Sequence, residues 1–83
     1  MVELTIEPAP RFKKEFGKLD KVVKEKIEAL IKKILQTPEI GKPMRYGRAG
    51  TRELYAGSHR FSYAHSKQEN KIYLLDIYHK DEQ

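Results

Sequence analysis

The residues best suited to chemistry lie on two β-rich segments that are joined by Gly57-Ser58. A two-residue loop that begins with glycine predicts a β-hairpin. In that hairpin Tyr55 lies opposite Arg60, and Glu53 shares their face because side chains alternate along a strand. A guanidinium binds phosphate, a carboxylate accepts a proton and an aromatic ring stacks on a base. These residues therefore predict a surface for single-stranded nucleic acid.

The apolar run at residues 72–78 predicts a further strand of the same sheet, at its centre. We expect one set of alternating side chains, Tyr73, Leu75 and Ile77, to face the core. They would join Leu54, Phe61 and Tyr63 of the hairpin there. The opposite parity consists of Asp76, Tyr78 and Lys80. If this polar parity joins the face of Arg60, two carboxylates, two cations and two rings meet on one concave surface. The alternative is an ordinary solvated sheet face with cross-strand ion pairs, and a register slip of one residue would reverse the assignment.

Other chemical motifs are weak. His59, His65 and His79 lack the spacing of zinc ligands, and the chain has no cysteine to supply a thiolate. The run Gly47–Gly50 lacks the strand-to-helix setting of a phosphate-binding loop. We therefore predict no metal site and no cofactor.

Length and charge narrow the class of protein. The 83 residues predict one domain spanning 1–83, and 17 Lys and Arg against 12 Asp and Glu give a net charge of +5. That excess favours RNA, DNA or an acidic protein as partner, although a merely soluble surface is the alternative. No apolar run approaches the roughly 20 residues of a membrane helix and the N-terminus does not read as a signal peptide, so we expect a cytoplasmic location and no membrane partner.

The elements that must position these residues follow from periodicity. Residues 2–6 alternate as a strand, and residues 10–17 and 19–36 have helical spacing, with Asp20 as the cap of the second helix and Thr37-Pro38 as its end. The stripe of the second helix expected to face the core consists of Leu19, Val22, Val23, Ile27, Leu30, Ile31, Ile34 and Leu35. A short strand is expected at residues 44–48. We predict an α+β fold in β-α-α-β-β-β order: an N-terminal strand, a helical hairpin, and a three- to four-stranded, mostly antiparallel sheet.

Two stretches resemble the RelE/ParE superfamily of toxins from bacterial and archaeal toxin–antitoxin pairs. The first is Lys42-Pro43-Met44 followed by Arg52-Glu53-Leu54-Tyr55-Ala56-Gly57-Ser58-His59-Arg60-Phe61-Ser62-Tyr63. The second is the ending Ile72-Tyr73-Leu74-Leu75-Asp76-Ile77-Tyr78-His79-Lys80, which is similar to a final strand closing on a basic residue. The expected order of helices and strands agrees with that of the family.

The resemblance implies a metal-independent endoribonuclease that cuts messenger RNA on the ribosome and is blocked by a RelB-like antitoxin that wraps it. It implies a phosphate-binding catalytic role for Arg60, a general base at Glu53, and a basic catalytic group at Lys80, with Tyr78 as a further proton carrier or stacking ring. The residues that we assign to RNA binding are Arg45, Arg48, Arg52 and Tyr55.

The sequence also departs from active RelE-type members. Many of them carry Tyr or His a few residues past the last strand, where this chain has Asp81-Glu82-Gln83, and some carry lysines at the positions of Thr51 and Glu53. Two alternatives therefore stand beside the endoribonuclease: a ParE-like inhibitor of DNA gyrase, and a catalytically inactive relative that only binds its antitoxin.

Overall fold

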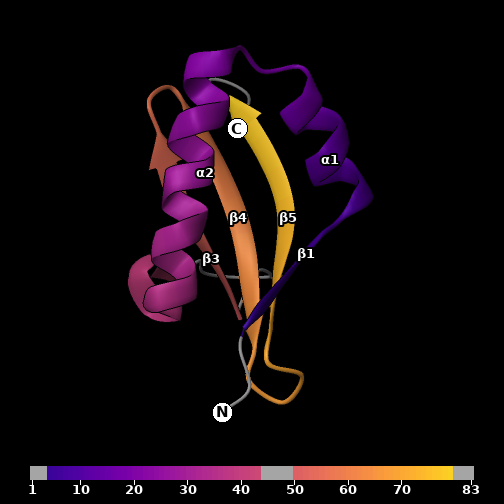
Figure 1. Ribbon diagram of the computed structural model, residues 1–83, viewed down its shortest axis with the longest axis vertical. Coiled ribbons are helices and arrows are strands. Elements are labelled where there is room, and N and C mark those ends of the chain that lie inside the picture. The colour runs from indigo at the N-terminus through magenta and orange to yellow at the C-terminus, as the bar shows by residue number, and fades with distance from the viewer. Residues whose placement is uncertain (1–3, 44–49, 80–83) are drawn as a thin grey trace.

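The chain folds into a helical layer over a mixed sheet. The computed structural model describes residues 4–43 and 50–79. Within these ranges the strand order of the sheet is β1-β5-β4-β3-β2, and Figure 1 shows the long helix in front of it. The strands are β1 (Thr5–Pro8), β2 (Lys42–Pro43), β3 (Thr51–Ala56), β4 (His59–Ser66) and β5 (Lys71–His79). The helices are α1 (Pro10–Gly17), α2 (Lys21–Gln36) and the short 3₁₀ helix η1 (Pro38–Ile40). The predicted α+β class is confirmed.

The N-terminal strand joins the same sheet as the four described strands that follow the helices. β1 pairs with β5 in parallel, so that the described sheet has five strands and one parallel edge. The two helices connect β1 to the rest of the chain, which gives it the crossover that a parallel strand requires. The strand expected at residues 44–48 lies outside the described residues, and β2 ends directly before them.

Both ends of α2 agree with the sequence signals. The Asp20 carboxylate accepts a hydrogen bond of 2.9 Å from the Val23 backbone N–H, which satisfies one of the free donors at the helix start. The helix ends at Gln36, before Thr37-Pro38, because proline cannot continue the hydrogen-bond ladder. The first helix ends at Gly17, as expected.

The core lies between the helices and one face of the sheet. Its buried residues are Phe12, Ile27, Ile34, Ala56, Phe61, Tyr63, Ile72, Leu74 and Ile77. The expected stripe of α2 was too wide: Val22 is 61% exposed and Leu35 37% exposed. At 100° per residue, Val22 lies roughly 130° and Leu35 roughly 90° around the helix from the centre of the stripe set by Ile27 and Ile34, so the sheet does not reach them. Among the described residues, no helix combines the length and the apolarity needed to cross a membrane.

A β-bulge overturns the expected parity of the last strand. Phe61 pairs with Ile77 and Ser62 with Asp76, but Tyr63 pairs with Leu74, so Leu75 is an extra residue. The extra residue reverses the alternation, and Ile72 and Leu74 join Ile77 in the core. The prediction that Tyr73 and Leu75 face the core was therefore wrong.

Candidate functional site

The sheet face turned away from the helices carries the candidate site. The predicted hairpin register is confirmed, with Tyr55 opposite Arg60 and Glu53 opposite Ser62. On the other side of β4, Arg60 is opposite Tyr78. Three adjacent strands thus bring four predicted residues to one face, and we call Glu53, Tyr55, Arg60 and Tyr78 the Glu53–Arg60 cluster.

Glu53 is the centre of the cluster. The Tyr78 hydroxyl donates to Glu53 Oε2 at 2.8 Å, and the Tyr55 hydroxyl donates to Glu53 Oε1 at 3.3 Å. The Glu53 side chain is only 12% exposed. Two tyrosines from different strands therefore fix this carboxylate, which orients its remaining lone pairs.

Arg60 is positioned mainly by the Tyr55 ring and only weakly by the charge of Glu53. Its nearest guanidinium nitrogen is 3.9 Å from Glu53 Oε1, which is too long for a hydrogen bond. Its guanidinium carbon lies 4.8 Å from the centre of the Tyr55 ring, a cation–π distance. Among residues 4–43 and 50–79, Arg60 Nε is buried and has no hydrogen-bond partner. The arginine is therefore positioned by packing, and within the described residues its terminal N–H groups, not the buried Nε–H, are left to bind an anion.

The other predicted residues lie elsewhere. The Asp76 carboxylate accepts from Arg11 of α1 at 2.9 Å and from the Ile77 N–H at 2.8 Å, so it fastens α1 to β5. Arg52 donates to the carbonyl oxygens of Glu39, at 3.2 Å, and Gly41, at 2.8 Å, so it holds the η1–β2 segment instead of joining the cluster. Arg45, Arg48 and Lys80 lie outside the described residues.

A small cavity lies beside the cluster, on the helical side of the same strand ends. It has a volume of about 210 Å³, and its lining includes His59, His79 and Tyr78. The two imidazole rings meet edge to face with centroids 5.1 Å apart. His79 has the opposite parity from Arg60, because the neighbouring Tyr78 is the residue that pairs with Arg60. The sequence analysis missed this pairing of histidines, because it depends on the register of β4 against β5, which the hairpin between β3 and β4 does not fix.

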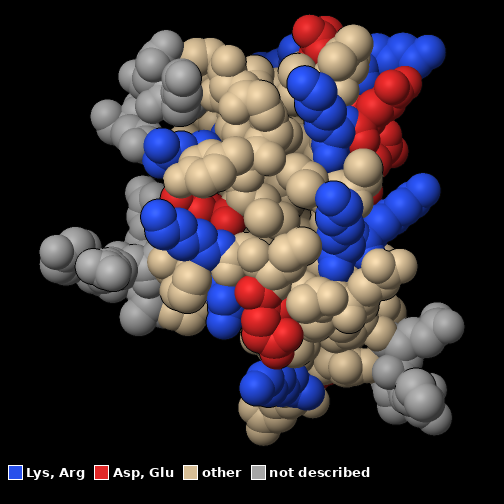
Figure 2. Space-filling model, turned by 90° about the vertical axis from the view of Figure 1, so that its left-hand side faces the viewer, with Lys and Arg blue, Asp and Glu red and all other residues tan. Residues whose placement is uncertain are grey.

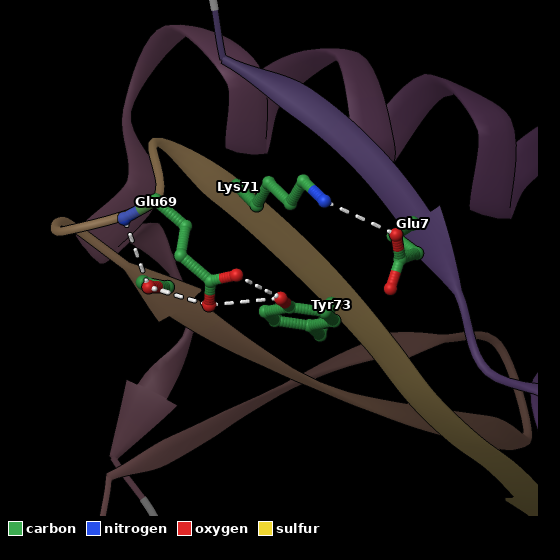
Figure 3. Close-up of polar contacts among 5 residues, drawn as sticks. Glu7, Glu69, Lys71 and Tyr73 are labelled. Carbon is green, nitrogen blue, oxygen red and sulfur yellow. Dashed lines mark hydrogen bonds and ion pairs between the residues drawn. The ribbon is translucent and has the colours of Figure 1, made fainter.

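A second polar group occupies the far end of the sheet face (Figure 3). The Tyr73 hydroxyl donates to both oxygens of Glu69, at 2.9 and 2.8 Å, and Lys71 Nζ lies 3.3 Å from Glu7 Oε1. The hydrogen bond to Glu69 raises the pKa of Tyr73 above 10.0, and the hydrogen bond to Glu7 raises the pKa of Lys71 above 10.5. This group joins β1 to β5 and closes the turn between β4 and β5.

These two pKa shifts predict a loss of stability in alkali. A group whose pKa is raised by folding stabilises the protein fully below its unfolded pKa, and the contribution is lost as pH rises through the folded pKa. We therefore expect the free energy of unfolding to fall as pH rises above about 10. The Tyr73→Phe variant, which lacks one of the titrating groups, should show a smaller fall in urea titrations at pH 9 and pH 11. Identical pH dependence in the two proteins would contradict this account.

Comparison with known proteins identifies the family to which this chain is similar. The model of a family described as the ParE toxin of type II toxin–antitoxin systems, parDE, matches residues 6–83. The search of curated proteins found no match.

Solved structures agree in fold. The YoeB/ParE toxin from Agrobacterium tumefaciens is 20% identical, with a TM-score of 0.82, over 90% of this chain and 96% of that one. The RelBE2 toxin–antitoxin complex from Mycobacterium tuberculosis contains a chain 22% identical, with a TM-score of 0.75, over 94% of this chain and 99% of that one. The YoeB–YefM complex from Staphylococcus aureus contains a chain 19% identical, with a TM-score of 0.78, over 94% of this chain and 99% of that one.

Proposed function

Because the chain belongs to the ParE toxin family of type II toxin–antitoxin systems, we propose that it is a toxin that acts through the Glu53–Arg60 cluster. Its proposed activity is that of a metal-independent endoribonuclease that cuts messenger RNA on the ribosome. One observation carries the proposal. The Arg60 guanidinium stacks on the Tyr55 ring and lies 3.9 Å from the Glu53 carboxylate. The hydroxyls of Tyr55 and Tyr78 hold that carboxylate in place. This arrangement leaves a cation and a proton acceptor side by side on the sheet face turned away from the helices.

In the proposed reaction the RNA supplies its own nucleophile. The Glu53 carboxylate takes the proton of a 2′-hydroxyl, and the 2′-oxygen forms a bond to the adjacent phosphorus. Arg60 stabilises the negative charge that develops on the phosphate oxygens. The bond from phosphorus to the 5′-oxygen breaks, and that oxygen leaves with a proton from the Tyr78 hydroxyl, which Glu53 can restore through their 2.8 Å hydrogen bond. The products are a 2′,3′-cyclic phosphate and a 5′-hydroxyl.

The experiment that tests the activity is cleavage of messenger RNA on purified ribosomes. We expect cleavage to continue when a chelator removes free transition metals at a magnesium concentration that keeps ribosomes intact, because protein side chains supply the charge. The cut ends should be a 2′,3′-cyclic phosphate, or its hydrolysis product, and a 5′-hydroxyl. Loss of cleavage with the chelator, restored by added zinc, would refute the metal-independent mechanism.

The second candidate is inhibition of DNA gyrase, which the match to a ParE family model favours. The two candidates predict different cellular effects. An endoribonuclease arrests translation, whereas an inhibitor of gyrase damages DNA. Pulse labelling of protein synthesis and a DNA-damage reporter after induction therefore separate them.

An antitoxin is the proposed protein partner, since the solved RelBE2 structure is a toxin–antitoxin complex. We expect the product of the adjacent gene to be acidic and extended, to wrap the toxin, and to co-purify with it. Exposed apolar side chains such as Val22, Ile40 and Tyr55 are available for such contacts. Free monomer alone, recovered after co-expression with the neighbouring gene, would contradict the pairing.

A further inference from the structure

Two histidines face each other across the ends of β4 and β5. His59 pairs directly with His79, and the centres of their rings are 5.1 Å apart. Opposite residues of an antiparallel pair have Cβ atoms about 4.5–5.5 Å apart, so the backbone itself holds the two side chains together. Arg60 and Tyr78, the next residues inward, form a pair of the other parity. The two histidines therefore lie on the helical face of the sheet, outside the Glu53–Arg60 cluster.

One of the two rings has a buried nitrogen atom without a partner. Among residues 4–43 and 50–79, His59 Nδ1 is buried and accepts or donates no hydrogen bond. The large majority of buried polar side-chain atoms in native proteins have a partner. In the tautomer with the proton on Nε2, Nδ1 presents a lone pair, the electron pair with which imidazole binds a metal ion. This nitrogen therefore indicates a ligand from outside the described chain.

The cavity beside the two rings has room for a hydrated ion. Its volume is about 210 Å³, and besides the histidines its lining residues are Glu15, Lys18, Leu19, Ile77 and Tyr78. A water molecule takes about 30 Å³ in the liquid, so an ion and several waters fit. Lys18 Nζ lies 3.2 Å from Glu15 Oε2. Because the carboxylate offsets the ammonium charge, the wall of the cavity does not repel a cation.

The spacing of the rings matches two ligands of one metal ion. Imidazole nitrogens lie about 2.0–2.1 Å from Zn²⁺, and at a tetrahedral angle this puts the two ring centres roughly 5 Å apart. The observed separation of His59 and His79 is 5.1 Å, with the ring planes at 85°. Rotation about the bond between Cβ and the ring turns a nitrogen of each toward a shared ion, and this torsion is soft in histidine.

No richer set of ligands competes for the ion in the part of the chain that the structure describes. No three of its His, Asp and Glu side chains are placed to hold a metal together. On the side of the molecule in Figure 2 the carboxylates are scattered among lysines, arginines and uncharged residues. A site of two imidazoles completed by water selects zinc, nickel or copper over magnesium and calcium, which prefer oxygen ligands.

We propose that His59 and His79 bind a divalent metal ion of the zinc, nickel and copper group, which ties the end of β4 to the end of β5. This proposal replaces the sequence-based prediction of no metal site, and it does not rest on the proposed function. The ion restrains the strands that carry Arg60 and Tyr78. It takes no part in RNA cleavage, because it lies on the other face of the sheet.

The test is thermal unfolding of the tag-free, metal-free protein with ZnCl₂ or MgCl₂. Competition with a zinc indicator dye gives the dissociation constant. Zinc at a tenfold excess over that constant should raise the melting temperature by roughly 5–10 °C, and the same concentration of magnesium should not. His59→Gln and His79→Gln should each abolish the zinc-induced shift. The matched control is His65→Gln, since His65 pairs with Ile72 at the other end of β4, and it should keep the shift.

Two results would overturn the proposal. One is a parent protein whose melting temperature does not respond to zinc and that does not compete with the indicator. The other is a zinc-induced shift that survives in His59→Gln and His79→Gln or is lost equally in His65→Gln. If a variant does not fold, nuclear magnetic resonance of the parent protein decides, because zinc should move the ring signals of His59 and His79 and leave those of His65. A protein that binds zinc at these rings and cuts no messenger RNA would refute the endoribonuclease and leave the metal site standing.

Discussion

Replacing Arg60 with alanine is expected to lower the rate of RNA cleavage by a hundred- to a thousandfold. A donor directed at charge that develops in the transition state contributes about 3–4 kcal/mol. Arg60 is the cation of the Glu53–Arg60 cluster, and its guanidinium makes no hydrogen bond to the Glu53 carboxylate, which is 3.9 Å away. Arg60→Lys should recover only part of the rate, because it keeps the charge and loses the planar pair of donors. The measurement is the single-turnover rate of cleavage on ribosomes.

The control for this experiment is Lys71→Ala, which removes a cation from the same sheet face, where it pairs with Glu7. Its cleavage rate should stay within about twofold of the parent rate. Glu53→Gln should slow cleavage without weakening RNA binding if Glu53 takes the proton. The competing view is that Arg60 and Glu53 form a structural surface pair worth at most about 1 kcal/mol. A fully active, slightly less stable Arg60→Ala would establish that view.

Replacing Tyr63 with phenylalanine removes a single oxygen atom but should lower the free energy of unfolding substantially. The Tyr63 hydroxyl is buried, donates to the Pro38 carbonyl oxygen at 2.8 Å, and accepts from the Gly41 N–H at 2.8 Å. The variant would leave both backbone groups without these bonds, at about 1–3 kcal/mol for each buried group. We expect a loss of about 2–4 kcal/mol in the free energy of unfolding, and of roughly 10 °C or more in melting temperature.

Tyr55→Phe is the matched control, because Tyr55 is 49% exposed and its hydroxyl bonds only to the Glu53 side chain in the described residues. It should change stability by less than about 0.5 kcal/mol. Burial also raises the pKa of Tyr63 above 10.0, so part of the alkaline loss of stability should disappear in Tyr63→Phe. Similar melting temperatures for the two variants would show that the η1–β2 segment does not depend on the Tyr63 hydroxyl.

The sequence by itself determined the local elements and one register. Asp20 and Thr37-Pro38 bound α2 because capping and the missing proline donor act within a few residues. The Gly57-Ser58 loop fixed the hairpin, since Gly57 takes a positive φ of 64° and a two-residue loop leaves a single register for the alternating strands. Glu53, Tyr55 and Arg60 could therefore be placed on one face without any tertiary information.

Only the tertiary structure decided what depends on contacts distant in the sequence. The extra residue Leu75 places Ile72 and Leu74 in the core, because the buried face of β4 selects apolar partners over strict alternation. Arg52 does not join the predicted site, because its guanidinium donates hydrogen bonds to carbonyl oxygens of the η1–β2 segment. The hydrogen bond from Tyr78 to Glu53 spans 25 residues and crosses β4, so it follows from the order of the strands. Periodicity reports which way a side chain points, whereas the packing of the sheet determines which side chain it meets.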